Sequence, residues 1–268
     1  GGMPRFSDDE TLVFCLRDNG YTHLYRVAVD GSGIRPLVDG TANVSGLSVA
    51  GPTAAIVLAT PESFGDVAVV DIADGGIRTL TSCGTTDLPI LPAEERRFTI
   101  SDGTVVTGWL RRDPDAEGPV PLLLDVHGGP HNAWNGAADL THPYHLVLAQ
   151  RGWAILTINP RGSDGYGDAF FSAVSGGWGV RDANDFLEPI DQLVAEGVAD
   201  PARLAVTGYS YGGFMTCYLT SRDDRFAAAV AGGVVTDLFS MGGTSDVGHY
   251  LSAKENGGLP WRDEERIS

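Results

Sequence analysis

The residues around Ser210 have the types and the spacing that nucleophilic catalysis requires. They read GYSYG over residues 208–212, a Gly-x-Ser-x-Gly pattern. In such a pattern the serine lies on a sharp turn between a strand and a helix, which exposes its hydroxyl to a neighbouring base. The apolar residues 204–207 predict the strand, and residues 214–219 predict the helix. We interpret Ser210 as a candidate nucleophile; the alternative is an ordinary serine in a glycine-rich turn.

An attacking serine also needs fixed donors for the oxyanion that develops on the carbonyl oxygen. One donor is expected from the backbone N–H of Tyr211, directly after the candidate nucleophile. The second should come from a loop after an earlier strand, and HGGP at residues 127–130 follows the apolar run that ends at Val126. We predict the Gly129 N–H as this donor because glycine lets a backbone approach a substrate closely. His127 is expected to be structural, near the site; a plain strand-to-loop turn is the alternative.

A third cluster reads NPRGSDGYG over residues 159–167 and follows a predicted strand at residues 154–158. Its position at the carboxyl end of a strand places it near the site by topology. Arg161 is predicted to hold the edge of the site together by pairing with Asp182 or Asp185, a structural role rather than a catalytic one. No His-x-x-x-His or Glu-x-x-His spacing occurs on a predicted helix, so we expect no metal and no cofactor.

The second half of the chain alternates between strands and helices from about Arg96 onward. A hairpin comes first, with strands at residues 98–100 and 105–110. The later strands are expected at residues 121–126, 154–158, 203–207 and 227–235, and the helices at residues 142–150, 178–196 and 212–221. Strict alternation predicts an α/β class, a parallel-rich sheet covered by helices.

The chain up to about residue 80 reads instead as short strands separated by turn signals. Residues 13–14, Leu24 and residues 33–37 are similar to residues 56–57, Val67 and residues 76–80, which lie 43 positions later. Propeller blades of four strands repeat at about 40–45 residues, so we expect all-β blades of a partial β-propeller; two hairpins of a sandwich are the alternative. The expected domains are residues 1–90, the C-terminal blades, and residues 91–268, the α/β domain.

The amino-acid composition excludes some classes of binding partner. Eighteen Lys and Arg stand against 35 Asp and Glu, a formal charge of −17, which would repel a phosphate backbone, so nucleic acid is not expected. No long apolar run and no signal peptide are visible, so no membrane association is expected. The three cysteines, at positions 15, 83 and 217, are widely spaced and odd in number, which favours a reducing, cytoplasmic location.

Together these clusters resemble the prolyl oligopeptidase family of serine peptidases, with its acylaminoacyl-peptidase and dipeptidyl-aminopeptidase branches as the best match. The matching segments, in order and spacing, are residues 127–130, 159–167, 177–179, 208–216, 224–226, 244–246 and 260–261. The resemblance covers essentially the whole chain. It implies an α/β-hydrolase domain preceded by a β-propeller that admits only peptides or partly unfolded segments.

By the resemblance, the protein hydrolyses peptide bonds of oligopeptides through an acyl-enzyme on Ser210, with the N–H groups of Gly129 and Tyr211 as the oxyanion hole. An acylaminoacyl- or dipeptidyl-type exopeptidase is expected. The pocket for the residue before the scissile bond would be apolar and lined by Val235, Leu238, Phe239 and Met241; the alternative is that these residues pack a core. A carboxylesterase, or a catalytically dead binding module, is the alternative function.

The chain departs from the family downstream of Ser210. The family places its triad Asp and then its His well after the nucleophile, whereas the sole histidine after Ser210 is His249. We therefore expect an internal fragment that lacks the triad acid and base, with the remaining part of the polypeptide as a partner chain. The alternative is that His249 is the base, oriented by Asp223, Asp224, Asp237, Asp246 or Asp263. The sequence is also compatible with a homo-oligomer.

Overall fold

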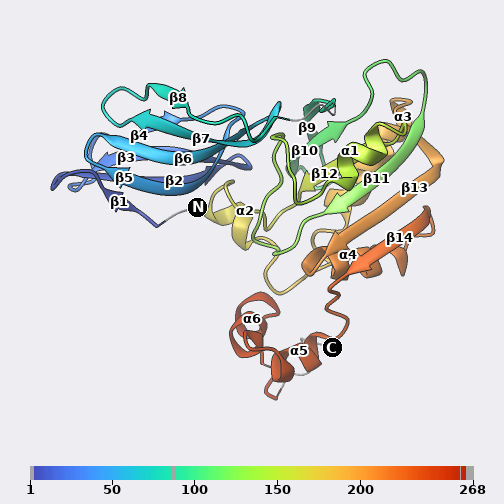
Figure 1. Cartoon of the computed structure of the whole chain (residues 1–268). Helices are drawn as coiled ribbons and strands as arrows, with labels where there is room; N and C mark the ends of the chain where they lie inside the picture. Colours follow the sequence, from blue (N-terminus) through green and yellow to red (C-terminus); the bar gives the residue numbers. More distant parts are fainter. Residues whose placement is uncertain (1–2, 86–88, 260, 264–268) are drawn as a thin grey trace. The chain divides into compact units, whose positions relative to one another are not determined.

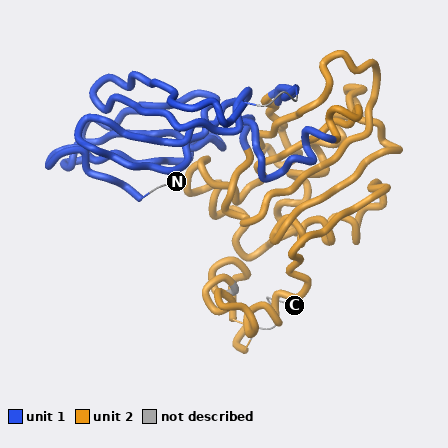
Figure 2. The backbone as a smooth tube through the Cα atoms, viewed as in Figure 1, with its two compact units in different colours: residues 1–94, 135–147 blue, residues 95–134, 148–268 orange. Residues whose placement is uncertain are grey.

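The computed structural model describes residues 3–85, 89–259 and 261–263, and the chain divides into two compact units (Figure 2). The first unit comprises Gly1–Glu94 and Asn135–Val147, and the second comprises Glu95–Trp134 and Leu148–Ser268. Within the described residues, no helix combines the length and the apolar character needed to cross a membrane.

Residues 135–147 belong to the first unit, to which their backbone N–H groups donate hydrogen bonds. The Gly136 N–H donates to the Tyr21 hydroxyl at 3.1 Å. The Ala138 N–H donates to the Thr60 carbonyl at 2.9 Å. A segment that connects two strands of the second unit in the sequence therefore belongs to the first unit.

Two four-stranded antiparallel sheets make up the first unit, each with its strands in sequence order (Figure 1). The strands are β1 (Arg5–Phe6), β2 (Thr11–Asp18), β3 (Tyr21–Ala28), β4 (Arg35–Val38), β5 (Asn43–Ala50), β6 (Thr53–Thr60), β7 (Ser63–Asp71) and β8 (Ile77–Thr79). Asn19 and Gly20 join β2 to β3 with φ of 49° and 89°, the left-handed conformation that a two-residue hairpin turn requires.

The 43-residue repeat corresponds to these two sheets. Val13 on β2 and Ile56 on β6 are both buried, in one apolar cluster to which both sheets contribute. The repeat predicts equivalent strands but not equal burial of each pair of matched side chains. Leu24 on β3 is buried, whereas Val67, at the matched position on β7, is 40% exposed. A slip of one residue along a strand turns a side chain to the opposite face. The two sheets are the four-stranded units that the repeat predicts; their membership of a propeller stays a prediction.

A six-stranded sheet forms the centre of the second unit, in the order β14-β13-β11-β12-β10-β9. Its strands are β9 (Ala93–Thr99), β10 (Val105–Arg111), β11 (Val120–Val126), β12 (Ala154–Asn159), β13 (Ala199–Tyr209) and β14 (Phe226–Gly232). β11 to β14 are parallel, and β10 runs antiparallel to β12. The chain passes from β11 to β12 on one side and returns to β13 on the other, so a ligand crevice is expected at the carboxyl ends of β11 and β13.

The helices connect and cover these strands. They are α1 (Tyr144–Ala149), α2 (Asp168–Ser172), α3 (Asn184–Ala195), α4 (Tyr211–Thr220), α5 (Leu238–Thr244) and α6 (Gly248–Glu255). The helix expected from residue 178 begins only at residue 184, because Gly179 has φ of 78° and residues 178–183 form turns. The strand expected to reach residue 235 ends at Gly232, because Gly233 has φ of 53°.

β14 lies at one edge of the six-stranded sheet (Figure 1). Its sequence, FAAAVAG, is apolar, and its five central residues are exposed. Val230, in the middle of the strand, is 69% exposed. An exposed apolar edge strand offers unpaired backbone groups to another chain and favours aggregation.

We expect Val230→Lys to slow aggregation of the 268-residue chain, because a charge on an edge strand opposes edge-to-edge pairing. The melting temperature should change by no more than about 2 °C, since exposed side chains contribute little to stability. Light scattering over time and a thermal melt measure both. The matched control is Val180→Lys, because Val180 is 78% exposed but lies outside the strands. Equal suppression by both variants would show that edge pairing is not the cause.

Candidate active site

Ser210 lies on the turn between β13 and α4, at the carboxyl edge of the sheet. Its φ is 60° and its ψ is −117°. This left-handed region is rare for a residue with a side chain. The Ser210 N–H donates to the Gly232 carbonyl at 3.0 Å, and the Ser210 carbonyl accepts from the Phe214 N–H at 3.0 Å. The expected strand–turn–helix setting of the Gly-x-Ser-x-Gly pattern is therefore present.

The glycines on either side of Ser210 are required by close approach of the backbone. A Cβ atom at Gly208 would lie 2.5 Å from the carbonyl group of Gly212. A Cβ atom at Gly212 would clash with the Val126 carbonyl oxygen at the end of β11. Because both clashes are with backbone atoms, neither can be relieved by moving a side chain. The turn thus packs directly against the neighbouring strand.

The loop after β11 lies beside this turn. A Cβ atom at Gly128 would be 3.1 Å from the Tyr209 carbonyl oxygen and 3.5 Å from Cβ of Ser210. Gly129 follows with φ of 137°, a backbone conformation that favours glycine. Tyr211 is the first residue of α4, where a helix leaves its N–H groups without intrahelical acceptors. The two backbone segments named as oxyanion donors, at Gly129 and Tyr211, therefore belong to neighbouring loops; their role stays a prediction.

Two histidines hold the loop after β11 in place. The His127 ring is buried, with Nδ1 2.8 Å from the Gly128 carbonyl oxygen and Nε2 3.1 Å from Oγ of Ser163. The His131 ring has Nδ1 2.7 Å from the Gly162 carbonyl oxygen and Nε2 2.9 Å from Oε1 of Glu255 on α6. Sequence reasoning missed His131, whose partner lies more than a hundred residues away. Both rings tie this loop to the loop after β12.

Arg161, in the loop after β12, is paired with Asp185 on α3. Its Nε lies 2.9 Å from Oδ2 of Asp185 and its Nη2 lies 2.7 Å from Oδ1, while its backbone N–H donates to Oδ2 at 2.8 Å. Nη1 reaches Asp102 at 2.8 Å. The hydrogen bonds that Arg161 donates to Asp185 raise the pKa of Arg161 further above its usual range. Of the two partners that the sequence offered, Asp185 is the one that Arg161 binds.

Asp182, the other candidate, binds the side chain of Tyr211 instead. The Tyr211 hydroxyl donates to Oδ2 of Asp182, and the Gly179 N–H donates to Oδ1 at 2.6 Å. Both side chains are fully buried. Burial raises the pKa of the Asp182 carboxyl to about 7, although the hydrogen bond from Tyr211 acts against this. Sequence reasoning had considered only the backbone of Tyr211.

The residues predicted to line the pocket before the scissile bond follow β14 and begin α5. Asp237 caps α5, accepting from the N–H groups of Phe239 at 3.0 Å and Ser240 at 3.2 Å. Leu238 packs against the apolar core of the second unit, whereas Phe239 is 44% exposed. Of the predicted set, the half-buried residues are Val235, Leu238 and Met241. Their role as a substrate pocket stays a prediction.

α6 reaches the site through Glu255 and not through His249. Glu255 is buried against His131 of the loop after β11, and its carbonyl accepts from the Gly176 N–H. His249 is exposed on the same helix. In the described part of the chain, no hydrogen bond joins His249 to Ser210, so the structure gives no support to His249 as the base.

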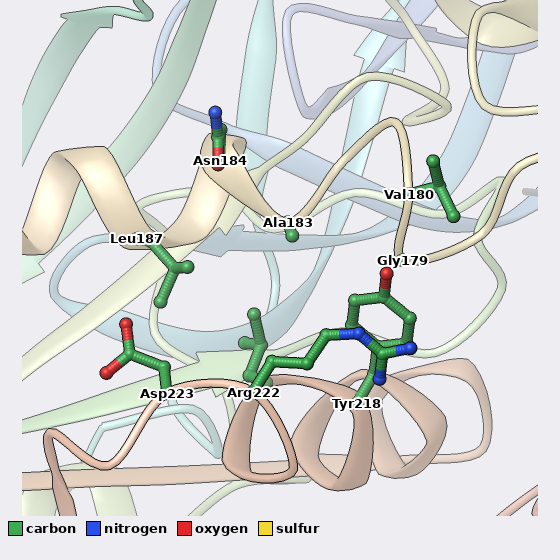
Figure 3. A pocket seen from close by; sticks show the side chains of 9 residues that line it. Gly179, Val180, Ala183, Asn184, Leu187, Tyr218, Arg222 and Asp223 are labelled. Carbon is green, nitrogen blue, oxygen red and sulfur yellow. The ribbon is translucent and has the colours of Figure 1, made fainter.

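A cavity of about 270 Å³ lies between α3 and the end of α4 (Figure 3). The Arg222 guanidinium lies over the Tyr218 ring at 3.9 Å, on the wall that α4 provides. The ten-residue helix α4 is about 15 Å long, and Ser210 precedes its other end. This cavity is therefore separate from the candidate nucleophile, although Gly179 on its wall also donates to Asp182.

Comparison with known proteins finds a family that matches the part of the chain containing these residues. The prolyl oligopeptidase family matches residues 142–268, which include Arg161, Asp182 and Ser210. An uncharacterized peptidase of Bacillus subtilis, YuxL, is 41% identical over 165 residues, 59% of this chain and 24% of that protein. The dipeptidyl aminopeptidase BIII of Pseudoxanthomonas mexicana is 40% identical over 119 residues, 44% of this chain and 17% of that protein.

The fold is also similar to that of a solved peptidase. The acylaminoacyl peptidase of Pyrococcus horikoshii matches 99% of this chain with a TM-score of 0.88 and 25% identity, and the match covers 42% of that structure. The chain spans only 17% to 24% of the length of the two curated relatives described above. Residues 142–268, which carry the Ser210 turn, the half-buried Arg161 and the buried Asp182, match the prolyl oligopeptidase family.

Proposed function

We propose that the protein to which this chain corresponds is a serine peptidase that cleaves peptide bonds of oligopeptides through an acyl-enzyme on Ser210. The observation that carries the proposal is the backbone of Ser210, held at φ of 60° where the sheet reverses its order. Strained conformations of this kind persist at functional sites because the surroundings impose them. The loop containing Gly128 lies beside it, where donors for an oxyanion are needed.

The reaction proceeds by addition and elimination. Oγ of Ser210 adds to the carbonyl carbon of the peptide bond while a base accepts its proton. The resulting oxyanion accepts hydrogen bonds from the N–H groups of Gly129 and Tyr211. The carbon–nitrogen bond then breaks, the base returns its proton to the leaving amine, and the acyl group stays on Oγ as an ester. Water adds with the help of the same base, and the second elimination releases the acid and restores Ser210.

The triad acid and base are proposed to lie in sequence that this chain does not cover. In the described residues, no histidine is hydrogen-bonded to Ser210: His127 and His131 hold loops, and His249 is exposed. The solved relative from Pyrococcus horikoshii is more than twice as long as the matched part. We propose that the rest of the polypeptide supplies the Asp and the His, either in the same chain or as a second chain.

The proposed substrates are peptides that lose either an acylated amino acid or a dipeptide from their N-terminus. Relatives carry the names dipeptidyl aminopeptidase and acylamino-acid-releasing enzyme, so we propose one of these exopeptidase types. Val235, Leu238, Phe239 and Met241 would give an apolar pocket for the residue before the scissile bond. The two sheets of the first unit are proposed to be blades of a β-propeller, and the exposed thiols of Cys83 and Cys217 suit a reducing, cytoplasmic location.

We expect Ser210→Ala in the whole protein to lower kcat for a peptide anilide by about 10⁴-fold or more, because the acyl-enzyme cannot form. Circular dichroism and the melting temperature should remain as in the wild type. The matched control is Ser221→Ala, since Ser221 is exposed at the end of α4 and bonds only locally. Undiminished peptidase activity of Ser210→Ala would overturn the proposal. Activity on esters but not on any peptide would replace it with a carboxylesterase.

We expect a broad apolar preference at the residue before the cleaved bond. A pocket of this kind separates neighbouring aliphatic side chains by only about 10- to 200-fold in kcat/KM. Val235→Phe should narrow the pocket and lower cleavage after large residues by about tenfold relative to cleavage after alanine. A peptide library measures the profile, and Val247→Phe, at a 47% exposed valine outside the proposed pocket, is the control. A strict requirement for Lys or Arg would show that the pocket is wrongly assigned.

A further inference from the structure

Tyr211 belongs to the proposed oxyanion hole through its backbone, but its side chain is anchored in the core. The side chain is fully buried. The Trp178 ring packs edge-on against it, with the ring centroids 5.2 Å apart. The hydroxyl donates to Asp182. The position of the Tyr211 side chain is therefore fixed from two sides.

Asp182 has both carboxylate oxygens engaged. Oδ2 accepts from the Tyr211 hydroxyl, and Oδ1 accepts from the Gly179 N–H at 2.6 Å. Gly179 is itself held in a left-handed turn, with φ of 78°, and a Cβ atom there would clash with the Tyr218 ring. Asp182 thus connects a rigid turn before α3 to the first residue of α4.

The charges around Asp182 do not explain why a carboxylate is buried there. The neighbouring Asp185 is paired with Arg161, which also binds Asp102. Within the described residues, Asp182 has no cation as a hydrogen-bond partner, and Tyr211 and Asp185 are the titratable groups that face it. Burying such a carboxylate lowers the stability of the fold, and a well-packed apolar residue in its place often gives equal or higher stability. What the carboxylate adds is a directional bond to the Tyr211 hydroxyl.

The hydrogen bond between Tyr211 and Asp182 affects the orientation of the peptide unit between Ser210 and Tyr211. Ser210 is strained at φ of 60°. Its carbonyl, which shares a planar peptide unit with the Tyr211 N–H, accepts from the Phe214 N–H at 3.0 Å. The direction of the Tyr211 N–H therefore depends on this bond on one side of the peptide unit and, on the other, on where the Tyr211 side chain is held. A donor aimed slightly away from the oxyanion loses much of its effect in the transition state.

We propose that Asp182 is a positioning residue of the peptidase, which holds the Tyr211 hydroxyl and thereby aims the Tyr211 N–H at the oxyanion. The inference rests on the proposed function and adds a residue to it. Asp182 touches neither substrate nor the reacting atoms in this role. Its effect should therefore appear in the transition state and not in the binding of substrate or product.

The test uses the whole protein carrying Tyr211→Phe, assayed about one pH unit above the Asp182 pKa of about 7. We expect kcat to fall about 10- to 100-fold while KM stays within about twofold, the pattern of an interaction made only in the transition state. Affinity for a peptide aldehyde, which forms a tetrahedral oxyanion on the serine, should fall by a similar factor. Binding of a product peptide should stay unchanged, which a general loss of structure would not allow.

Asp182→Asn and the double variant complete a mutant cycle. Asp182→Asn leaves one acceptor oxygen for two donors, the Tyr211 hydroxyl and the Gly179 N–H, so we expect kcat to fall in the same direction as in Tyr211→Phe. The kcat of the double variant should be no lower than that of the less active single variant, since both substitutions act on the same hydrogen bond. The matched control is Tyr25→Phe in the first unit, where the hydroxyl lies 3.4 Å from the Asp18 carboxylate; it should keep wild-type kcat.

The outcomes separate the inference from the proposed function. A wild type that neither cleaves peptides nor binds the aldehyde overturns the proposed function. An active wild type with Tyr211→Phe at full kcat and full aldehyde affinity overturns the inference alone. A parallel loss of product binding, or additive effects in the double variant, also overturns it. Melting temperatures identify variants that do not fold, and if Tyr211→Phe is one of them, Asp182→Asn decides by the same criteria.

Discussion

Ser210 adopts a backbone conformation that a residue with a side chain seldom takes, and its neighbours are arranged around that conformation. A left-handed non-glycine residue costs about 1–3 kcal/mol. Two backbone hydrogen bonds, to the Gly232 carbonyl and from the Phe214 N–H, hold Ser210 in place at 3.0 Å each. Relaxing the turn would break both bonds and displace the start of α4. The parallel strands on either side thus impose the position of the hydroxyl.

The loops that meet at this edge are held by hydrogen bonds between polar side chains with little exposure to solvent. Arg161 ties the loop after β12 to α3 through Asp185, whose side chain is fully buried. His131 ties the loop after β11 to α6 through Glu255. Away from bulk water such hydrogen bonds are electrostatically stronger, so they restrict the movement of the groups that they join. The arrangement gives the two backbone segments near Ser210 a defined geometry that the loop sequences alone would not provide.

Much of this architecture could be predicted from local sequence patterns. The apolar runs and the Gly-x-Ser-x-Gly pattern placed Ser210 between a strand and a helix, and the 43-residue repeat predicted two similar sheets. The bond between Tyr211 and Asp182 could not be predicted, because it joins side chains from separate elements and leaves no periodicity. The late start of α3 was missed because Gly179 adopts a left-handed turn that only the fold imposes. The face change between Leu24 and Val67 depends on a register that the repeat does not encode.

Covalent labelling tests most directly whether Ser210 is the nucleophile of a peptidase. The whole protein would be treated with a fluorophosphonate, digested, and analysed by mass spectrometry to locate the adduct. We expect a single adduct on the peptide that contains Ser210, and protection from labelling by an acylated peptide substrate. An adduct on a different serine, or no adduct on a folded protein, would contradict it.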